Sequence, residues 1–189
     1  MTKRNFKSGK GKYYKSCSEM PLYSFIKVLT SGDKSLMGKG SPVQLEEAWQ
    51  TILNEFSAIA SEATQGSVLA IVKNISMSNN NLKIIELIAE PLKRSYDPAL
   101  CDSINQMGYD YKYNEQTKEQ DLNLIIDAIK AAVVDLDKPS TQHSDPNPSS
   151  YYSLLSDLSN FIGDSIDDKT ISLFRFVELM NKYNLSKYN

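Results

Sequence analysis

The hydrophobic and polar positions along this chain repeat with helical spacing, most clearly over residues 41–66. There, apolar side chains return every three or four residues on one face, and acids and amides occupy the other face. Ser41, Pro42 and Gln44 have the residue types of an N-cap, a first-turn proline and a capping box, and Gly66 is a typical helix stop. The pattern predicts one long helix over residues 41–66.

Weaker versions of the same pattern predict further helices on both sides of this segment. They cover residues 21–31, 67–77, 82–89, 98–107, 119–136, 151–162 and 169–183. For residues 67–77 a buried strand is the alternative, and a helix is favoured. Residues 109–113 alternate tyrosine with charged side chains, which fits either a strand or an extended connector.

Polar residues and proline are expected to mark several helix ends. The polar run at residues 78–81 should end one helix, and Pro91 should kink or restart the next. Asp97 has the position of an N-cap, and either Asp167 or Asp168 should cap the last helix.

Together these segments predict an all-α fold, an irregular helical bundle of about seven or eight helices with an extended N-terminal arm. The helices at residues 41–66 and 119–136 are the predicted central pair. Trp49 and Phe56 are expected to face the core from the first of them.

Composition divides the chain into four expected segments. These are a basic flexible arm at 1–18, a helical core domain at 19–137, a proline-rich linker at 138–150 and a C-terminal helix pair at 151–189. Because two helices alone cannot bury their apolar faces, the last segment should dock on the core or on a partner.

Charge is distributed unevenly along the chain. The formal net charge is −2, yet residues 1–18 contain six basic side chains and no acid, so the rest of the chain carries −8. Such an arm can attract phosphates, and its tyrosines can stack on bases. An acidic protein partner and a solubilising tail without a partner are the alternatives. The predicted contact residues for nucleic acid or protein are Lys3, Arg4, Lys7, Lys10, Lys12, Tyr13, Tyr14 and Lys15.

Residue types that carry catalysis or bind metals are sparse. His143 is the only histidine and lies in the proline-rich linker, away from any rigid scaffold. Cys17 and Cys101 are far apart and are expected to be free thiols. We therefore predict a protein that is not an enzyme and has no cofactor and no metal site.

Two short segments were compared with motifs for anion and calcium binding. Residues 38–41 read Gly-Lys-Gly-Ser, which lacks the spacing and the preceding strand of a phosphate-binding loop. The acids at Asp164, Asp167 and Asp168 lack the alternation and the central glycine of a calcium-binding loop. The first is interpreted as an ordinary capped loop, and the second as a helix cap.

No apolar run is long enough for a membrane span, and the apolar stretch at residues 20–29 lacks the features of a signal peptide. We expect a protein of the cytoplasm or of a virus particle, without membrane contact. Its expected partner is another protein, a second copy of itself, or both.

Two stretches resemble small helical accessory and structural proteins of bacteriophages. One contains Leu22-Tyr23-Ser24-Phe25-Ile26, Leu45-Glu46-Glu47-Ala48-Trp49 and Ile52-Leu53-Asn54-Glu55-Phe56, and the other contains Thr170-Ile171-Ser172-Leu173-Phe174-Arg175-Phe176. The resemblance implies a structural or accessory component of a bacteriophage particle. Binding to nucleic acid through the basic arm is the alternative function.

Overall fold

The computed structural model describes residues 13–132 and 151–187, and within these ranges the fold is α-helical without a β-strand. Seven α-helices and one short 3-10 helix lie in the described ranges, which confirms the predicted all-α helical bundle. Residues 1–12 of the predicted arm at 1–18, and the predicted linker at residues 138–150, lie outside the described residues.

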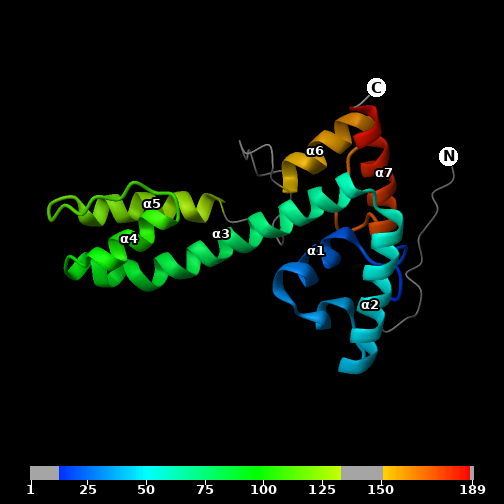
Figure 1. The fold of residues 1–189 in the computed structure, drawn as a ribbon, viewed down its shortest axis with the longest axis horizontal. Coiled ribbons are helices and arrows are strands. Elements are labelled where there is room, and N and C mark those ends of the chain that lie inside the picture. The colour runs from blue at the N-terminus through cyan, green and yellow to red at the C-terminus, as the bar shows by residue number, and fades with distance from the viewer. Residues whose placement is uncertain (1–12, 133–150, 188–189) are drawn as a thin grey trace. The chain divides into compact units, whose positions relative to one another are not determined.

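Figure 1 shows the helices of the described residues in chain order. They are α1 (Leu22–Ser31), η1 (Lys34–Met37), α2 (Pro42–Ile59), α3 (Glu62–Arg94), α4 (Pro98–Gln106), α5 (Lys118–Ala132), α6 (Tyr151–Ile162) and α7 (Leu173–Ser186).

The chain forms two compact units. Met1–Val72 and Ser140–Asn189 belong to unit 1, and Lys73–Pro139 belong to unit 2. The C-terminal helices α6 and α7 therefore share a unit with α1 and α2, a grouping that differs from the predicted core domain over residues 19–137. The predicted central pair is wrong, because α2 lies in unit 1 and α5 in unit 2.

Aromatic side chains form the centre of unit 1. The ring centroid of Phe25 in α1 lies 5.5 Å from that of Trp49 and 5.2 Å from that of Phe56, both in α2. All three side chains are buried, which confirms the predicted inward orientation of Trp49 and Phe56. Helix α7 packs against α1 and α2, and α6 packs against α7, so the C-terminal helix pair docks on unit 1.

Backbone hydrogen bonds also join the segment before α1 to the segment before α7. The Leu22 amide donates to the Ile171 carbonyl at 3.0 Å, and the Leu173 amide donates to the Met20 carbonyl at 2.8 Å. Two helix starts that are far apart in sequence are thereby held side by side, with their first amide donors satisfied.

Aliphatic side chains dominate the core of unit 2, where the later part of α3 packs with α4 and α5. The buried members are Ile85, Ile88, Leu92, Cys101, Ile104, Tyr111, Leu122 and Ile129. Tyr111 lies in the segment between α4 and α5, which has no strand partner. Of the two alternatives for residues 109–113, the structure contains the connector.

The predicted single helix over residues 41–66 is wrong, because the structure has two helices there. Helix α2 begins with the predicted capping box but ends at Ile59, and α3 begins at Glu62. Gly66 is inside α3 and is not a helix stop.

Asn181 of α7 explains this break. Its side-chain oxygen accepts hydrogen bonds from the Ser61 amide at 3.1 Å and the Thr64 hydroxyl at 2.8 Å. Its side-chain nitrogen donates to the Ile59 carbonyl at 2.9 Å. One amide side chain thus provides partners for the end of α2 and the start of α3, where an isolated helix has none. The partner comes from 120 residues away in sequence.

Helix α3 also continues where ends were predicted. The expected stop at residues 78–81 is wrong, and the favoured helix at residues 67–77 is confirmed as part of α3. Asparagine disfavours a helix by only about 0.5 kcal/mol per residue, whereas burial of Ile85 and Leu92 contributes several times more. Pro91 lies within the last turns of α3 and does not end the helix.

The last helix begins later than predicted. Helix α7 starts at Leu173, and its N-cap is Ser172, whose hydroxyl accepts a hydrogen bond from the Arg175 amide. The predicted cap at Asp167 or Asp168 is therefore wrong. Asp167 instead accepts the Lys169 amide in the preceding turn. The Asp97 cap of α4 is confirmed.

Candidate interaction surfaces

The structure describes three of the eight predicted contact residues, Tyr13, Tyr14 and Lys15. The Tyr14 amide donates to the Met37 carbonyl at 3.0 Å, and Tyr13 pairs with Gly38 in an isolated antiparallel bridge. Tyr13 and Tyr14 are half-buried, and only Lys15 is exposed. The other five predicted residues, Lys3, Arg4, Lys7, Lys10 and Lys12, lie outside the described residues.

The ring of Tyr13 packs on the loop that follows η1. A Cβ added at Gly40 would lie 3.0 Å from Cδ1 of this ring, so glycine allows the close approach. The Lys15 ammonium lies 5.3 Å from the centroid of the same ring. Tyr13 thus holds the loop and Lys15 together, and one of its ring faces is engaged by the protein itself.

Cys17 ties this segment to α2. Its amide donates to the Glu55 carboxylate at 2.7 Å, and its thiol donates to the Ile52 carbonyl at 3.4 Å. Burial, and then the charge of Glu55, raise the pKa of the Cys17 thiol to about 12. The thiol therefore stays protonated at neutral pH and acts as a packed, hydrogen-bonded side chain. Residues 13–18, assigned to the arm by composition, are part of unit 1.

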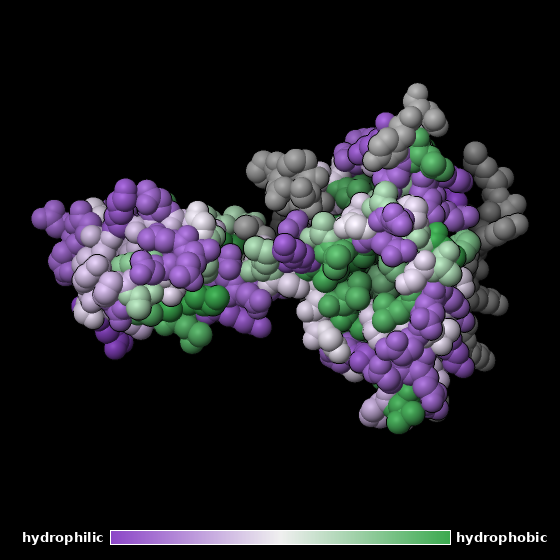
Figure 2. Space-filling view, in the orientation of Figure 1, coloured by the Kyte–Doolittle hydropathy of each residue, from purple (hydrophilic) through white to green (hydrophobic). Residues whose placement is uncertain are grey.

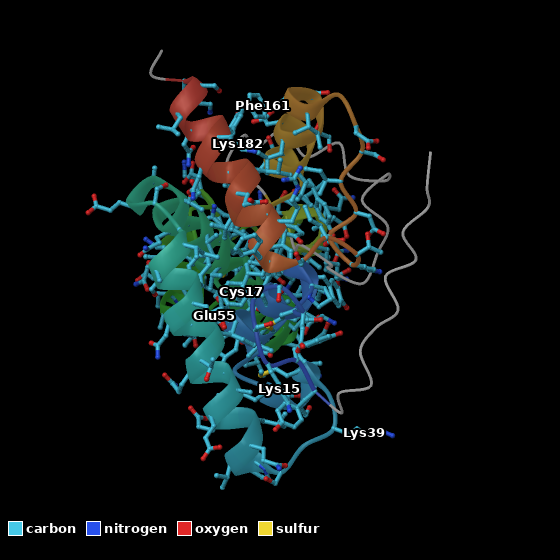
Figure 3. The ribbon with its side chains drawn as sticks, turned by 90° about the vertical axis from the view of Figure 1, so that its right-hand side faces the viewer. Lys15, Cys17, Lys39, Glu55, Phe161 and Lys182 are labelled. Atoms are coloured by element: carbon cyan, nitrogen blue, oxygen red, sulfur yellow. The ribbon has the colours of Figure 1, made fainter. Side chains whose placement is uncertain are left out.

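Two exposed lysines lie beside this attachment. Lys39 stands between Gly38 and Gly40, next to Tyr13, and has no ion-pair partner among the residues that the structure describes. Figure 3 shows Lys39 pointing away from the unit, whereas Cys17 and Glu55 face each other at α2. Lys34 is neutralised by Glu46 at 2.6 Å. Lys15 and Lys39 thus add positive charge on both sides of Tyr13.

Unit 1 also contains a buried pair of ionisable side chains. The Tyr151 hydroxyl in α6 donates to the Asp168 carboxylate at 2.7 Å, and both residues are buried. Burial, and then the charge of Asp168, raise the pKa of Tyr151 far above its ordinary value. The Asp168 carbonyl accepts the Tyr23 amide, so this residue connects α6 with α1. The contacts indicate a structural role that the sequence pattern missed.

Within the described ranges, no three or more His, Cys, Asp or Glu side chains gather where they could hold a metal ion. None of the helices described combines the length and the hydropathy that crossing a membrane requires.

Several exposed apolar side chains of unit 2 lie along α3. The exposed fractions are 52% for Met77, 39% for Ile84 and 75% for Leu87. Two further exposed residues complete the series, Asn80 before Ile84 and Pro91 after Leu87. Steps of three and four residues separate these five positions, so they lie on one side of the helix. Figure 2 shows apolar side chains at the surface of this unit among polar ones. We call these five residues the α3 face.

Sequence periodicity did not identify the α3 face for a definite reason. The predicted break at residues 78–81 divides it into two short pieces, and each piece taken alone fits a buried helix. Only the continuous helix shows that Ile85 and Ile88 point into the core while Ile84 and Leu87 point to solvent.

Comparisons with protein-family models, curated proteins and solved structures found no match to this chain. The resemblance to bacteriophage proteins stays a prediction.

Proposed function

We propose that this protein is a non-enzymatic helical interaction protein that works through protein–protein contacts made by the α3 face of unit 2. The observation that carries the proposal is the 75% exposed fraction of Leu87, in line with exposed Ile84 and Met77 on one helix. Burying a large aliphatic side chain contributes about 1.5–3 kcal/mol. Because Leu87 stays exposed in the folded chain, the free energy of burying its side chain can stabilise a complex with a partner.

The chemistry of the α3 face favours a helical partner. Its five residues, four of them apolar, are separated by alternating steps of three and four, which match the stripe that a second helix with the same spacing can fill. A role in a bacteriophage particle fits this proposal, and its support is the sequence resemblance.

The test uses a photo-crosslinking amino acid at position 87 of the full-length protein, expressed in the cells in which the protein is normally made. We expect a covalent protein adduct at position 87. The matched control is position 124 in α5 of the same unit, where Leu124 has a 68% exposed fraction but does not lie on α3. Absence of any adduct at position 87, or equal adducts at both positions, would contradict the proposal.

Nucleic-acid binding through the basic residues is the second candidate. The observation in its favour is the exposed pair of Lys15 and Lys39 beside Tyr13, the first described residue after the five basic residues of 1–12. Neutralising the five upstream cations should weaken binding to a single-stranded 20-mer and flatten its salt dependence, because fewer counterions are released. Fluorescence anisotropy at several salt concentrations measures both effects.

A matched control for this candidate neutralises five exposed lysines elsewhere, including Lys73, Lys112 and Lys130. If both variants bind equally, or if the unchanged protein does not bind, the second candidate is wrong.

A further inference from the structure

We infer that the partner of the α3 face is a second copy of this chain, with the two α3 helices antiparallel and related by a twofold axis. The inference rests on the proposed function and adds the identity of the partner and the register of the contact. Three observations carry it: the spacing of the α3 face, the charges beside it and the self-complementarity of both.

The spacing defines an antiparallel register. Met77, Asn80, Ile84, Leu87 and Pro91 alternate in the manner of the a and d positions of a two-helix seam, and exposed Arg94 continues the series. At 100° per residue these positions span an arc of roughly 100°. An axis between residues 85 and 86 places Ile84 of each copy opposite Leu87 of the other. Met77 then meets Arg94 of the second copy, whose long aliphatic stem can cover it.

The charges beside the seam select this orientation. Lys83 and Glu90 are exposed and lie on the same flank of the α3 face. In the antiparallel register, Lys83 of each copy lies beside Glu90 of the other, so the twofold axis produces two opposite-charge pairs. In a parallel pair of α3 helices in the same register, Lys83 of one copy would instead lie near Ile88 of the other, which carries no charge. The charge pattern therefore favours the antiparallel pair.

Both charged side chains can make these contacts. Glu90 has an ion pair with Lys93 in its own chain at 2.9 Å, and this pair is exposed. Exposed pairs of this kind stabilise a protein only weakly, so the Glu90 carboxylate can add or exchange a cation at little cost. Lys83 has no ion-pair partner within the described part of the chain. The opposite flank contains Asn81 and carries no charge that would repel a second copy.

Sedimentation velocity of the full-length protein over a range of concentrations tests the inference. We expect a reversible dimer. Leu87→Glu should weaken it at least about tenfold, because it places charge against an apolar partner. Leu124→Glu, a matched exposed leucine on α5, should leave the dimer unchanged.

The charges are tested by a swap. Lys83→Glu and Glu90→Lys should each weaken the dimer about 3- to 10-fold, because each creates two like-charge contacts across the axis. The double variant should return to within about twofold of the unchanged protein. Glu86→Lys is the control, since Glu86 is exposed on the same helix but away from the seam. Thermal unfolding of every variant shows whether its fold is retained.

The outcomes separate this inference from the proposed function. A monomer at all concentrations, together with a position-87 adduct to a different protein, would overturn self-association and leave the proposed function standing. If Leu87→Glu weakens the dimer while the Lys83 and Glu90 variants fail to show the expected loss and recovery, that result would overturn the antiparallel register. A dimer indifferent to Leu87→Glu would overturn the surface itself.

Discussion

The two units of this protein are built in different ways. Unit 1 combines segments from both ends of the chain and joins them by polar contacts between residues more than 100 positions apart, such as Asn181 with Ser61. Unit 2 is one continuous stretch with an aliphatic core. A polar exception in this core is Tyr111, whose buried hydroxyl has no hydrogen-bond partner among the described residues.

This difference shows where specificity and association can reside. In unit 1 the buried polar groups Thr64 and Asp168 have partners from other helices, so its segments fit together in one arrangement. Unit 2 exposes Met77, Ile84 and Leu87 in one row along α3. We therefore place structural definition in unit 1 and partner binding in unit 2.

The variant with the largest expected effect tests whether the two units unfold independently of each other. Trp49→Ala should destabilise unit 1 by about 3–5 kcal/mol, because it removes a buried ring that packs against Phe25. Hydrogen exchange should show lost protection in α1, α2 and α7, with much smaller changes in α4 and α5. An equal loss in α4 and α5 would mean that the two units unfold together, which would break the comparison.

The next effect concerns the polar contacts that join α7 to the break between α2 and α3. Asn181→Ala should cost about 2–3 kcal/mol, because the Ile59 carbonyl, the Ser61 amide and the Thr64 hydroxyl lose a partner. Chemical denaturation measures this cost. Lys182→Ala, on the exposed neighbour labelled in Figure 3, should change stability by less than about 0.5 kcal/mol. Similar costs for the two variants would refute the role assigned to Asn181.

Each unit contains a buried tyrosine hydroxyl, so the same substitution can be compared in both. Tyr151→Phe should destabilise unit 1 by about 1–2 kcal/mol, because the buried Asp168 carboxylate loses its donor. Tyr111→Phe should be neutral within about 0.5 kcal/mol or slightly stabilising, because the hydroxyl that it removes has no partner. Denaturation of both variants under one set of conditions gives the comparison, and the reverse order of costs would contradict it.

The smallest effect uses the two cysteines, one in each unit, as reporters of local opening. Both thiols are free and buried, and burial is the main cause that raises the pKa of each. With a pKa of about 12, the Cys17 thiol is ionised to roughly one part in ten thousand at pH 8, so it should react only after unit 1 opens. We expect Cys101 to react first with a thiol reagent, as mass spectrometry of the labelled peptides can show. Faster labelling of Cys17 than of Cys101 would contradict this expectation.

Much of the local structure could be predicted from the sequence. The capping box of α2, the Asp97 cap of α4 and the inward face with Trp49 depend on residues within one or two turns of each other. The glycine after α1, Gly32, adopts a positive φ of 73°, which favours glycine at a helix end. Such features are local, so spacing and residue type were sufficient to find them.

The candidate surfaces were less accessible to prediction. Composition identified the basic residues at the start of the chain, but it placed the end of the arm after residue 18. Hydrogen bonds of Tyr14 and Cys17 to η1 and α2 bring residues 13–18 into unit 1 instead. The α3 face escaped prediction, because a polar run that breaks many isolated helices does not break one whose other side is buried.

The sequence by itself determined the helical class, most helix starts and the apolar faces, because helix propensity, capping and periodicity act over a few residues. The tertiary structure decided where α2 ends, how far α3 runs and which apolar residues stay exposed. The physical reason is distance along the chain. Asn181 satisfies backbone groups at Ile59 and Ser61 from 120 residues away, and core burial outweighs the weak local signals at residues 78–81.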